Sequence, residues 1–325
     1  MSRWFSLFLV IAVAGLSIAC SGEASNEIDA ASPDVASIVV NSTPQGTHPP
    51  VQALEPTNWV YWLSDIKLSE IAAVSPDAVV IDYSQGGGED TEFSRSDIDT
   101  LRSGMSGPAL VISYMSIGEA EDYRYYWKSA WSSSKPSWLE KENHNWAGNY
   151  KVRYWEPEWQ FLIFGTPDSY LDKIIATGCD GVYLDIIDAY DYFLEKGRTT
   201  AEDEMVMFVS AISEYAKSKR PGFLIFPQNA PELGARSDYF TVIDGIGIEG
   251  VYFGWEEPNK RTPASDTAWL EEQLAWIVDA GKTVLAVDYA SSANDIADAY
   301  QSSRARGFVP TVTDVNLAQL PYPEK

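Results

Sequence analysis

The sequence predicts a single (β/α)8 barrel of the TIM type, preceded by a signal segment and a disordered tether. From about residue 58 onward, short apolar β-prone runs alternate with helix-like stretches, and this alternation indicates a parallel sheet. The strand candidates span a length close to the roughly 250 residues that are usual for such a barrel. An open doubly wound sheet is the alternative, but no glycine fingerprint follows the first strand.

Residues 1–20 have the features of a lipoprotein-type signal peptide. Arg3 supplies the positive end, an apolar stretch follows, and Ala19 precedes Cys20. The segment 16–20 resembles the bacterial lipobox, although its leucine lies four residues before the cysteine instead of three. We therefore expect lipid attachment at Cys20 and a membrane-anchored lipoprotein of the bacterial cell envelope, facing the periplasm or the exterior. A secretory peptide cleaved nearby and an uncleaved anchor are the alternatives.

Residues 21–52 are rich in Ser, Ala, Pro, Asp and Thr and show no sustained hydrophobic period, which is typical of a flexible tether. Residues 53–325 then form the predicted barrel domain, for which we expect a monomer. The chain holds 47 acidic and 23 basic residues, a net charge of −24. Such a charge excludes nucleic acid as a partner and favours a cationic one.

The composition also limits the chemistry. Cys179 is the only cysteine after the signal segment, so no disulfide is expected. Two histidines make a His-rich zinc site implausible, and we expect no metal and no cofactor. The 12 Trp and 18 Tyr residues are a weak indication of carbohydrate binding, because both side chains stack on sugars.

The elements follow one another in order along residues 53–325. Each strand is predicted from an apolar β-prone run, and each helix from an amphipathic stretch. Strands are expected at 59–63, 78–83, 109–117, 182–184, 223–227, 243–248, 283–287 and 308–312. Helices are expected at 68–74, 96–103, 168–177, 201–219, 267–280 and 294–304.

A long aromatic insertion, residues 123–159, separates the third strand from the helix before the fourth. Loops at the carboxyl face of a barrel carry function, so this one could form a sugar-binding wall that includes Trp155. A hydrophobic lid packed on the barrel explains the same rings equally well.

Acidic residues end several of the predicted strands, and the carboxyl ends of barrel strands converge on one face. Glycoside hydrolysis requires two carboxyl groups, one to protonate the leaving oxygen and one to act as nucleophile or base. Neighbouring carboxylates also raise one another's pKa. These strand-end acids are Asp82, Glu119, Asp185, Glu249 and Asp288.

Asp185 follows the buried run 182–184, and Glu249 lies between Gly247 and Gly250. A structural cap is the plain alternative for Asp185, and a salt bridge with Arg124 or Arg236 is the alternative for Glu249. Both acids have apolar neighbours, so the residues alone do not separate the acid from the nucleophile.

Three stretches together identify a family resemblance. They are 114–124 (YMSIGEAEDYR) with Trp127, the pair Trp155 and Trp159, and 178–185 (GCDGVYLD). The chain resembles the endo-α-1,4-polygalactosaminidases, glycoside hydrolase family 114, over about residues 58 to 315.

The resemblance implies a (β/α)8 barrel that cuts an α-1,4-linked galactosamine polymer with retention of configuration. It implies Asp185 as nucleophile at the end of the fourth strand and Glu249 as acid/base at the end of the sixth. An acidic cleft suits this cationic amino sugar.

We expect further contacts with the polysaccharide from strand-end and loop residues, namely Tyr61, Asp82, Glu119, Tyr183, Asp188, Trp155 and Asp288. Two other functions remain open from the sequence. One is a non-catalytic glycan-binding lipoprotein, and the other is a metal-dependent hydrolase that uses Asp82, Glu119 and Asp185.

Overall fold

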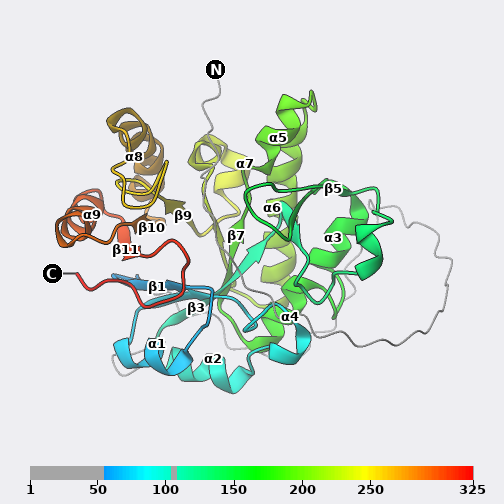
Figure 1. Cartoon of the computed structure of the whole chain (residues 1–325), viewed down its shortest axis with the longest axis horizontal. Helices are drawn as coiled ribbons and strands as arrows, with labels where there is room; N and C mark the ends of the chain where they lie inside the picture. Colours follow the sequence, from blue (N-terminus) through cyan, green and yellow to red (C-terminus); the bar gives the residue numbers. More distant parts are fainter. Residues whose placement is uncertain (1–54, 104–107, 325) are drawn as a thin grey trace.

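The structure is a computed structural model that describes residues 55–103 and 108–324. It confirms the predicted barrel: eight parallel strands lie at the predicted places in the chain, with helices around them (Figure 1). The strands are β1 (Trp59–Trp62), β2 (Ala78–Ile81), β3 (Leu110–Ser116), β7 (Gly181–Asp185), β8 (Leu224–Pro227), β9 (Gly245–Glu249), β10 (Thr283–Tyr289) and β11 (Val309–Thr313).

The strands pair in sequence order in two ladders, β1-β2-β3-β7-β8 and β9-β10-β11. A single parallel bridge, Gln228 to Gly247, joins β8 to β9. At the other seam, Trp59 Nε1 donates to the Val309 carbonyl at 2.9 Å, and Thr311 Oγ1 donates to the Trp59 carbonyl at 3.0 Å. The strands therefore follow one another around the barrel, with continuous ladders interrupted at two seams.

Helices connect most of the strands, and in Figure 1 α8 and α9 lie on the opposite side of the strands from α3. They are α1 (Leu68–Val74), α2 (Arg95–Arg102), α3 (Pro157–Ile163), α4 (Tyr170–Thr177), α5 (Ala189–Glu195), α6 (Ala201–Lys219), α7 (Ser237–Phe240), α8 (Ala264–Asp279) and α9 (Ala293–Ala305). No described helix is long and apolar enough to cross a membrane.

The described chain after β11 continues to Glu324 without a helix. Its backbone returns to the first strand, because the amides of Leu63 and Ser64 both donate to the Leu317 carbonyl, at 2.8 and 3.0 Å. Leu317 itself belongs to the hydrophobic cluster of the barrel interior.

The barrel interior is a separate hydrophobic cluster from the layer between strands and helices. Alternate residues of a strand point to opposite faces, so the interior takes every second residue. Tyr61, Ile112, Tyr114, Tyr183 and Leu285 all belong to this interior cluster. The same alternation turns Asp185, two residues after Tyr183, toward the barrel axis.

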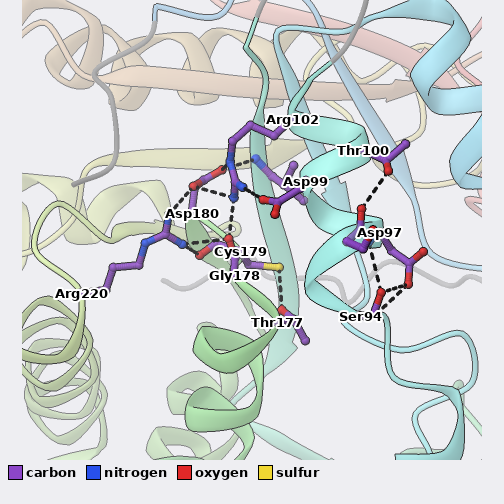
Figure 2. Close-up of polar contacts among 12 residues, drawn as sticks. Ser94, Asp97, Asp99, Thr100, Arg102, Thr177, Gly178, Cys179, Asp180 and Arg220 are labelled. Atoms are coloured by element: carbon purple, nitrogen blue, oxygen red, sulfur yellow. Dashed lines mark hydrogen bonds and ion pairs between the residues drawn. The ribbon is translucent and has the colours of Figure 1, made fainter. Parts of the chain in front are cut away.

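A buried polar cluster stabilises the opposite, amino-terminal end of β7 (Figure 2). Asp180 is 3% exposed and pairs with Arg220 at 2.7 Å and Arg102 at 3.1 Å. Its Oδ2 also accepts the Val111 amide at 2.9 Å. Removing one partner of such a buried group is costly, so this cluster fixes β7 against β3 and α2.

The insertion after β3 forms a small antiparallel sheet, β4 (Glu119–Glu121), β5 (Leu139–Glu142) and β6 (Asn149–Val152), followed by α3. Five of its eleven rings are buried in the core between strands and helices, namely Tyr126, Trp131, Trp138, Tyr154 and Trp159. This packing favours the lid alternative over a sugar-binding wall of exposed rings.

Candidate active site

Asp185 ends β7, and the backbone that follows it is strained. Ile186 has φ +61, a left-handed conformation that β-branched residues rarely adopt. This turn lets the Ile186 amide donate to Asp185 Oδ1 at 2.8 Å. It also brings the Ile186 carbonyl so close to Gly118 that a Cβ at Gly118 would lie 2.2 Å from it. Such strain is typical of functional sites.

The second oxygen of Asp185 is held from the neighbouring strand. The Tyr114 hydroxyl donates to Asp185 Oδ2 at 2.7 Å. Tyr114 lies on β3 and pairs in register with Tyr183 of β7. Its hydroxyl therefore contacts a residue two positions further along β7. Both oxygens of Asp185 therefore accept hydrogen bonds.

Glu249 ends β9 and is held in a similar way. The Tyr289 hydroxyl donates to its Oε1, and Asn229 Nδ2 donates to its Oε2 at 2.9 Å. Asn229 has φ +64, so the turn after β8 is also left-handed. The salt-bridge alternative does not apply, because Arg124 pairs with Asp82 and Glu121, and Arg236 pairs with acids of α6 and α7.

The glycines of β9 make room for rings from β7 and β8. A Cβ at Gly247 would lie 1.9 Å from the Tyr183 hydroxyl oxygen, and one at Gly245 would lie 2.2 Å from Phe226 Cε1. Gly250, directly after Glu249, has φ +64. A side chain at Gly247 would clash with the Tyr183 ring, whereas Gly250 has a backbone conformation that other residues rarely adopt.

Asp185 and Glu249 are electrostatically coupled. Burial raises the pKa of Asp185 to about 8, and the negative charges of Glu249 and Asp188 add to the effect. The hydrogen bonds from Tyr114 and Ile186 oppose it. The arrangement is a pair of carboxyl groups in which one proton is readily retained near neutral pH.

Tyrosines line the interior beside this pair. Burial raises the pKa of Tyr61, Tyr183 and Tyr289 well above the usual value, and the charges of Asp185 and Glu249 act in the same direction. All three therefore remain protonated. Tyr61 donates to Gln228 Oε1 at 3.1 Å and is 1% exposed, and Tyr183 is fully buried. The two predicted substrate-contact tyrosines thus lie in the barrel interior.

Asp82, at the end of β2, is engaged by a cation. Arg124 Nη1 lies 2.6 Å from Asp82 Oδ2, and Arg124 Nε donates to Glu121 Oε2 at 2.6 Å. The Arg124 side chain is 1% exposed. Glu121 is thus the second acid beside Arg124, whereas Glu119 pairs with Lys151.

Glu119 and Asp188 interact electrostatically with each other, and Asp188 also interacts with Asp185 and Glu249. Glu119 is 1% exposed, and its Oε1 accepts from Asn143 Nδ2 at 3.0 Å and Lys151 Nζ at 3.2 Å. Asp188 lies just before α5 and interacts electrostatically with Lys151 and Glu249. Burial raises the pKa of both carboxyl groups.

Two other predicted contact residues have structural partners. Asp288 precedes the interior residue Tyr289, so its side chain points outward from the barrel. Its Oδ1 accepts hydrogen bonds from the amides of Tyr252 and Phe253 at 2.7 and 2.8 Å. It therefore fixes the loop that follows Glu249. One face of Trp155 is covered by the guanidinium of Arg198, 3.7 Å from the ring centroid.

The metal-dependent alternative receives no support from the geometry. Asp82 and Glu119 each pair with a cation, Arg124 and Lys151. Within residues 55–103 and 108–324 there is no group of three or more His, Cys, Asp or Glu side chains placed to hold a metal ion.

Comparison with known proteins decides the family. The sequence model of glycoside-hydrolase family GH114 matches residues 39–323. The chain belongs to family GH114. A Methanocaldococcus jannaschii protein is 36% identical over 267 residues, which cover 78% of this chain and 74% of the relative.

Two solved structures share the fold of this GH114 glycoside hydrolase. The glycoside hydrolase domain of PelA from Pseudomonas aeruginosa aligns with a TM-score of 0.64 at 19% identity, over 83% of this chain and 99% of that one. Aspergillus fumigatus Ega3, solved in complex with galactosamine, aligns with a TM-score of 0.63 at 18% identity, over 86% and 99%.

Several residues around the pair in this GH114 enzyme were not predicted. Tyr114 and Tyr289 could have been found by strand alternation, because both are interior residues near a strand end. Asn229 lies two residues after the fifth strand, close to where strand-end polar groups were sought. Lys151 gave no sequence signal, since its place depends on the pairing of β4 with β6.

Proposed function

We propose that this glycoside hydrolase cuts an α-1,4-linked, galactosamine-containing polysaccharide internally, with retention of anomeric configuration. The observation that carries the proposal is the coupled pair Asp185 and Glu249 at the ends of β7 and β9, each accepting a tyrosine hydroxyl. The galactosamine bound to the structurally similar Ega3 supports the choice of sugar.

In the proposed reaction, Asp185 Oδ attacks the anomeric carbon while the bond to the leaving oxygen breaks. Glu249 gives its proton to that oxygen, which leaves a covalent glycosyl–Asp185 intermediate. Water then attacks the same carbon and transfers its proton to Glu249, and the bond to Asp185 breaks. The carboxyl groups of a retaining pair lie about 5 to 5.5 Å apart.

The raised pKa of Asp185 bears on this assignment, because a nucleophile must be ionised. An amino sugar brings a positive charge, which lowers the pKa of a nearby carboxyl group. The hydrogen bonds from Tyr114 and Ile186 also favour the ionised form. Binding of a cationic sugar would thus ionise Asp185 when it is needed.

Two measurements test the assignment. Proton NMR of the first product from a partly de-N-acetylated α-1,4-galactosamine polymer should show the α-anomer before mutarotation. Azide should rescue Asp185→Gly by giving a β-glycosyl azide, and Glu249→Gly by giving an α-glycosyl azide. The reverse pattern would exchange the two roles, and a β-anomeric first product would rule out retention.

We also propose that the enzyme is a monomer held at the bacterial cell envelope by a lipid on Cys20, which lies outside the described residues. A labelled fatty acid should be incorporated by the wild type. Incorporation that persists in Cys20→Ala would exclude this anchor. A molecular mass of 36.0 kDa or less in solution, measured by light scattering, is expected for the monomer.

A further inference from the structure

We propose that Glu119 and Asp188 form a subsite for the ammonium and a neighbouring hydroxyl of a hexosamine unit, and that Lys151 occupies this subsite when no sugar is bound. The inference rests on the proposed function in one respect, that the substrate carries amino sugars. It adds the group that is recognised and a residue that sets specificity.

The first observation is an incompletely satisfied carboxylate. Glu119 Oε1 accepts two hydrogen bonds, from Asn143 and Lys151, whereas Oε2 is buried and has no hydrogen-bond partner among the described residues. The residue is 1% exposed. A buried, ionisable oxygen without a donor is unfavourable, and a functional role is one of the recognised reasons for keeping such a group.

The second observation is the position of this group relative to the catalytic pair. The charge of Asp188 raises the pKa of both Glu119 and Asp185, and that of Glu249 raises the pKa of Asp188. Asp188 therefore interacts electrostatically both with Glu119 and with the proposed catalytic carboxyl groups Asp185 and Glu249. In the proposed subsite, a sugar unit next to the cleaved bond places its substituents beside Asp188 and Glu119.

The third observation is the cation already present. Lys151 is the cross-strand partner of Glu119 in the β4–β6 pair, and its Nζ lies 3.2 Å from Glu119 Oε1. Its side chain is 23% exposed, so it is free to leave toward solvent. Its Nζ also lies 5.0 Å from the centroid of the Tyr192 ring, a contact that can be kept after Lys151 leaves Glu119.

The donor groups of the sugar suit the Glu119 oxygen to which Lys151 does not donate. An ammonium and a vicinal hydroxyl offer two donor groups side by side, and a carboxylate accepts at two oxygens. A hexosamine can therefore satisfy both Glu119 oxygens, whereas Lys151 reaches one. N-acetylation removes the positive charge that lets the sugar compete with Lys151.

Binding of α-1,4-linked galactosamine trisaccharide and its N-acetylated form, followed by calorimetry, tests the subsite. All proteins carry Asp185→Asn to keep the probes intact. Glu119→Gln should weaken binding of the galactosamine trisaccharide by roughly tenfold. Lys151→Met should tighten it several-fold, and Lys151→Arg should restore the original value. The N-acetylated trisaccharide should respond to none of these changes.

Lys141→Met is the matched control, because Lys141 is an exposed lysine of the same small sheet that also contacts Tyr192. It should leave both affinities unchanged. Melting curves establish that each variant folds.

The subsite is overturned if Lys151→Met weakens the galactosamine trisaccharide, leaves its affinity unchanged, or shifts both probes by the same factor. It is also overturned if neither probe binds. Selective binding without hydrolysis of the polymer by the wild type would contradict the proposed function and leave the subsite standing.

Discussion

The hydroxyl of Tyr114 lies 2.7 Å from Oδ2 of Asp185 and donates a hydrogen bond to it across the β3–β7 pair. A donor in this place stabilises the ionised carboxyl group. It opposes the burial and the charge of Glu249, which together raise the pKa of Asp185. Tyr114 is thus a positioning residue that controls how readily Asp185 ionises.

Tyr114→Phe should therefore shift the acidic limb of the kcat/KM–pH profile to higher pH and lower kcat/KM about tenfold below neutral pH, since a hydrogen bond to a charged group is worth about 1.5–3 kcal/mol. Tyr239→Phe is the control, because the Tyr239 hydroxyl has no hydrogen-bond partner in the described structure. An unshifted profile in Tyr114→Phe would disprove this role.

Stability should depend on pH through Asp185. Its pKa is raised from 3.8 to about 8, so the folded state holds a proton that the unfolded chain has lost between these values. Asp185 therefore makes the protein less stable as pH rises from about 4 to 8, by at most about 1.4 kcal/mol per unit. Asp185→Asn removes this loss.

Melting temperatures from pH 4 to 9 give the measurement. The melting temperature of Asp185→Asn should rise relative to that of the wild type with each step in pH up to about 8. Above that pH the difference should stay constant. Asp279→Asn, at an exposed position at the end of α8, should give a difference that does not change with pH. A constant difference for Asp185→Asn would contradict the raised pKa.

Gly247→Ala should disturb the packing of β9 against Tyr183, next to the candidate active site. The added Cβ would lie 1.9 Å from the Tyr183 hydroxyl oxygen, so the ring or β9 must move. We expect a loss of about 1–3 kcal/mol in the free energy of unfolding, together with reduced kcat. Urea titration measures the first effect. Gly86→Ala, where the nearest atom lies 3.9 Å away, should leave both quantities unaltered.

Arg124→Met should be more destabilising, because it leaves Asp82 and Glu121 buried without their shared cation. A loss of about 3–5 kcal/mol in the free energy of unfolding is expected. Arg95→Met, which changes an arginine on the exposed surface of α2, provides the comparison in the same urea titration. Equal losses for the two variants would show that the buried cluster adds nothing.

The sequence was sufficient for the barrel because its strands are apolar runs that repeat at regular intervals. The resemblance to the family indicated Asp185 and Glu249, whose catalytic roles stay a prediction. The sequence was not sufficient for details that depend on three-dimensional pairing. Glu121, not Glu119, meets Arg124, since β4 turns the two residues to different surroundings. Asp288 shares a strand end with the other acids but has the outward alternation, so it binds backbone amides.

The small sheet after β3 was missed for a related reason. Its strands are three or four residues long, too short to give a clear alternating pattern in the sequence. Lys151 and the incompletely satisfied Glu119 both arise from the pairing of β4 with β6.

The course of the chain at its entry into the barrel has a consequence for orientation. Glu55 to Asn58 precede the first residue of β1, so the described chain enters at the amino-terminal end of the strands, where Thr57 and Asn58 bind Asp77. Asp185 and Glu249 lie at the opposite end. If the proposed anchor at Cys20 holds the protein, the domain is attached through Glu55, on the far side of the barrel from the proposed active site.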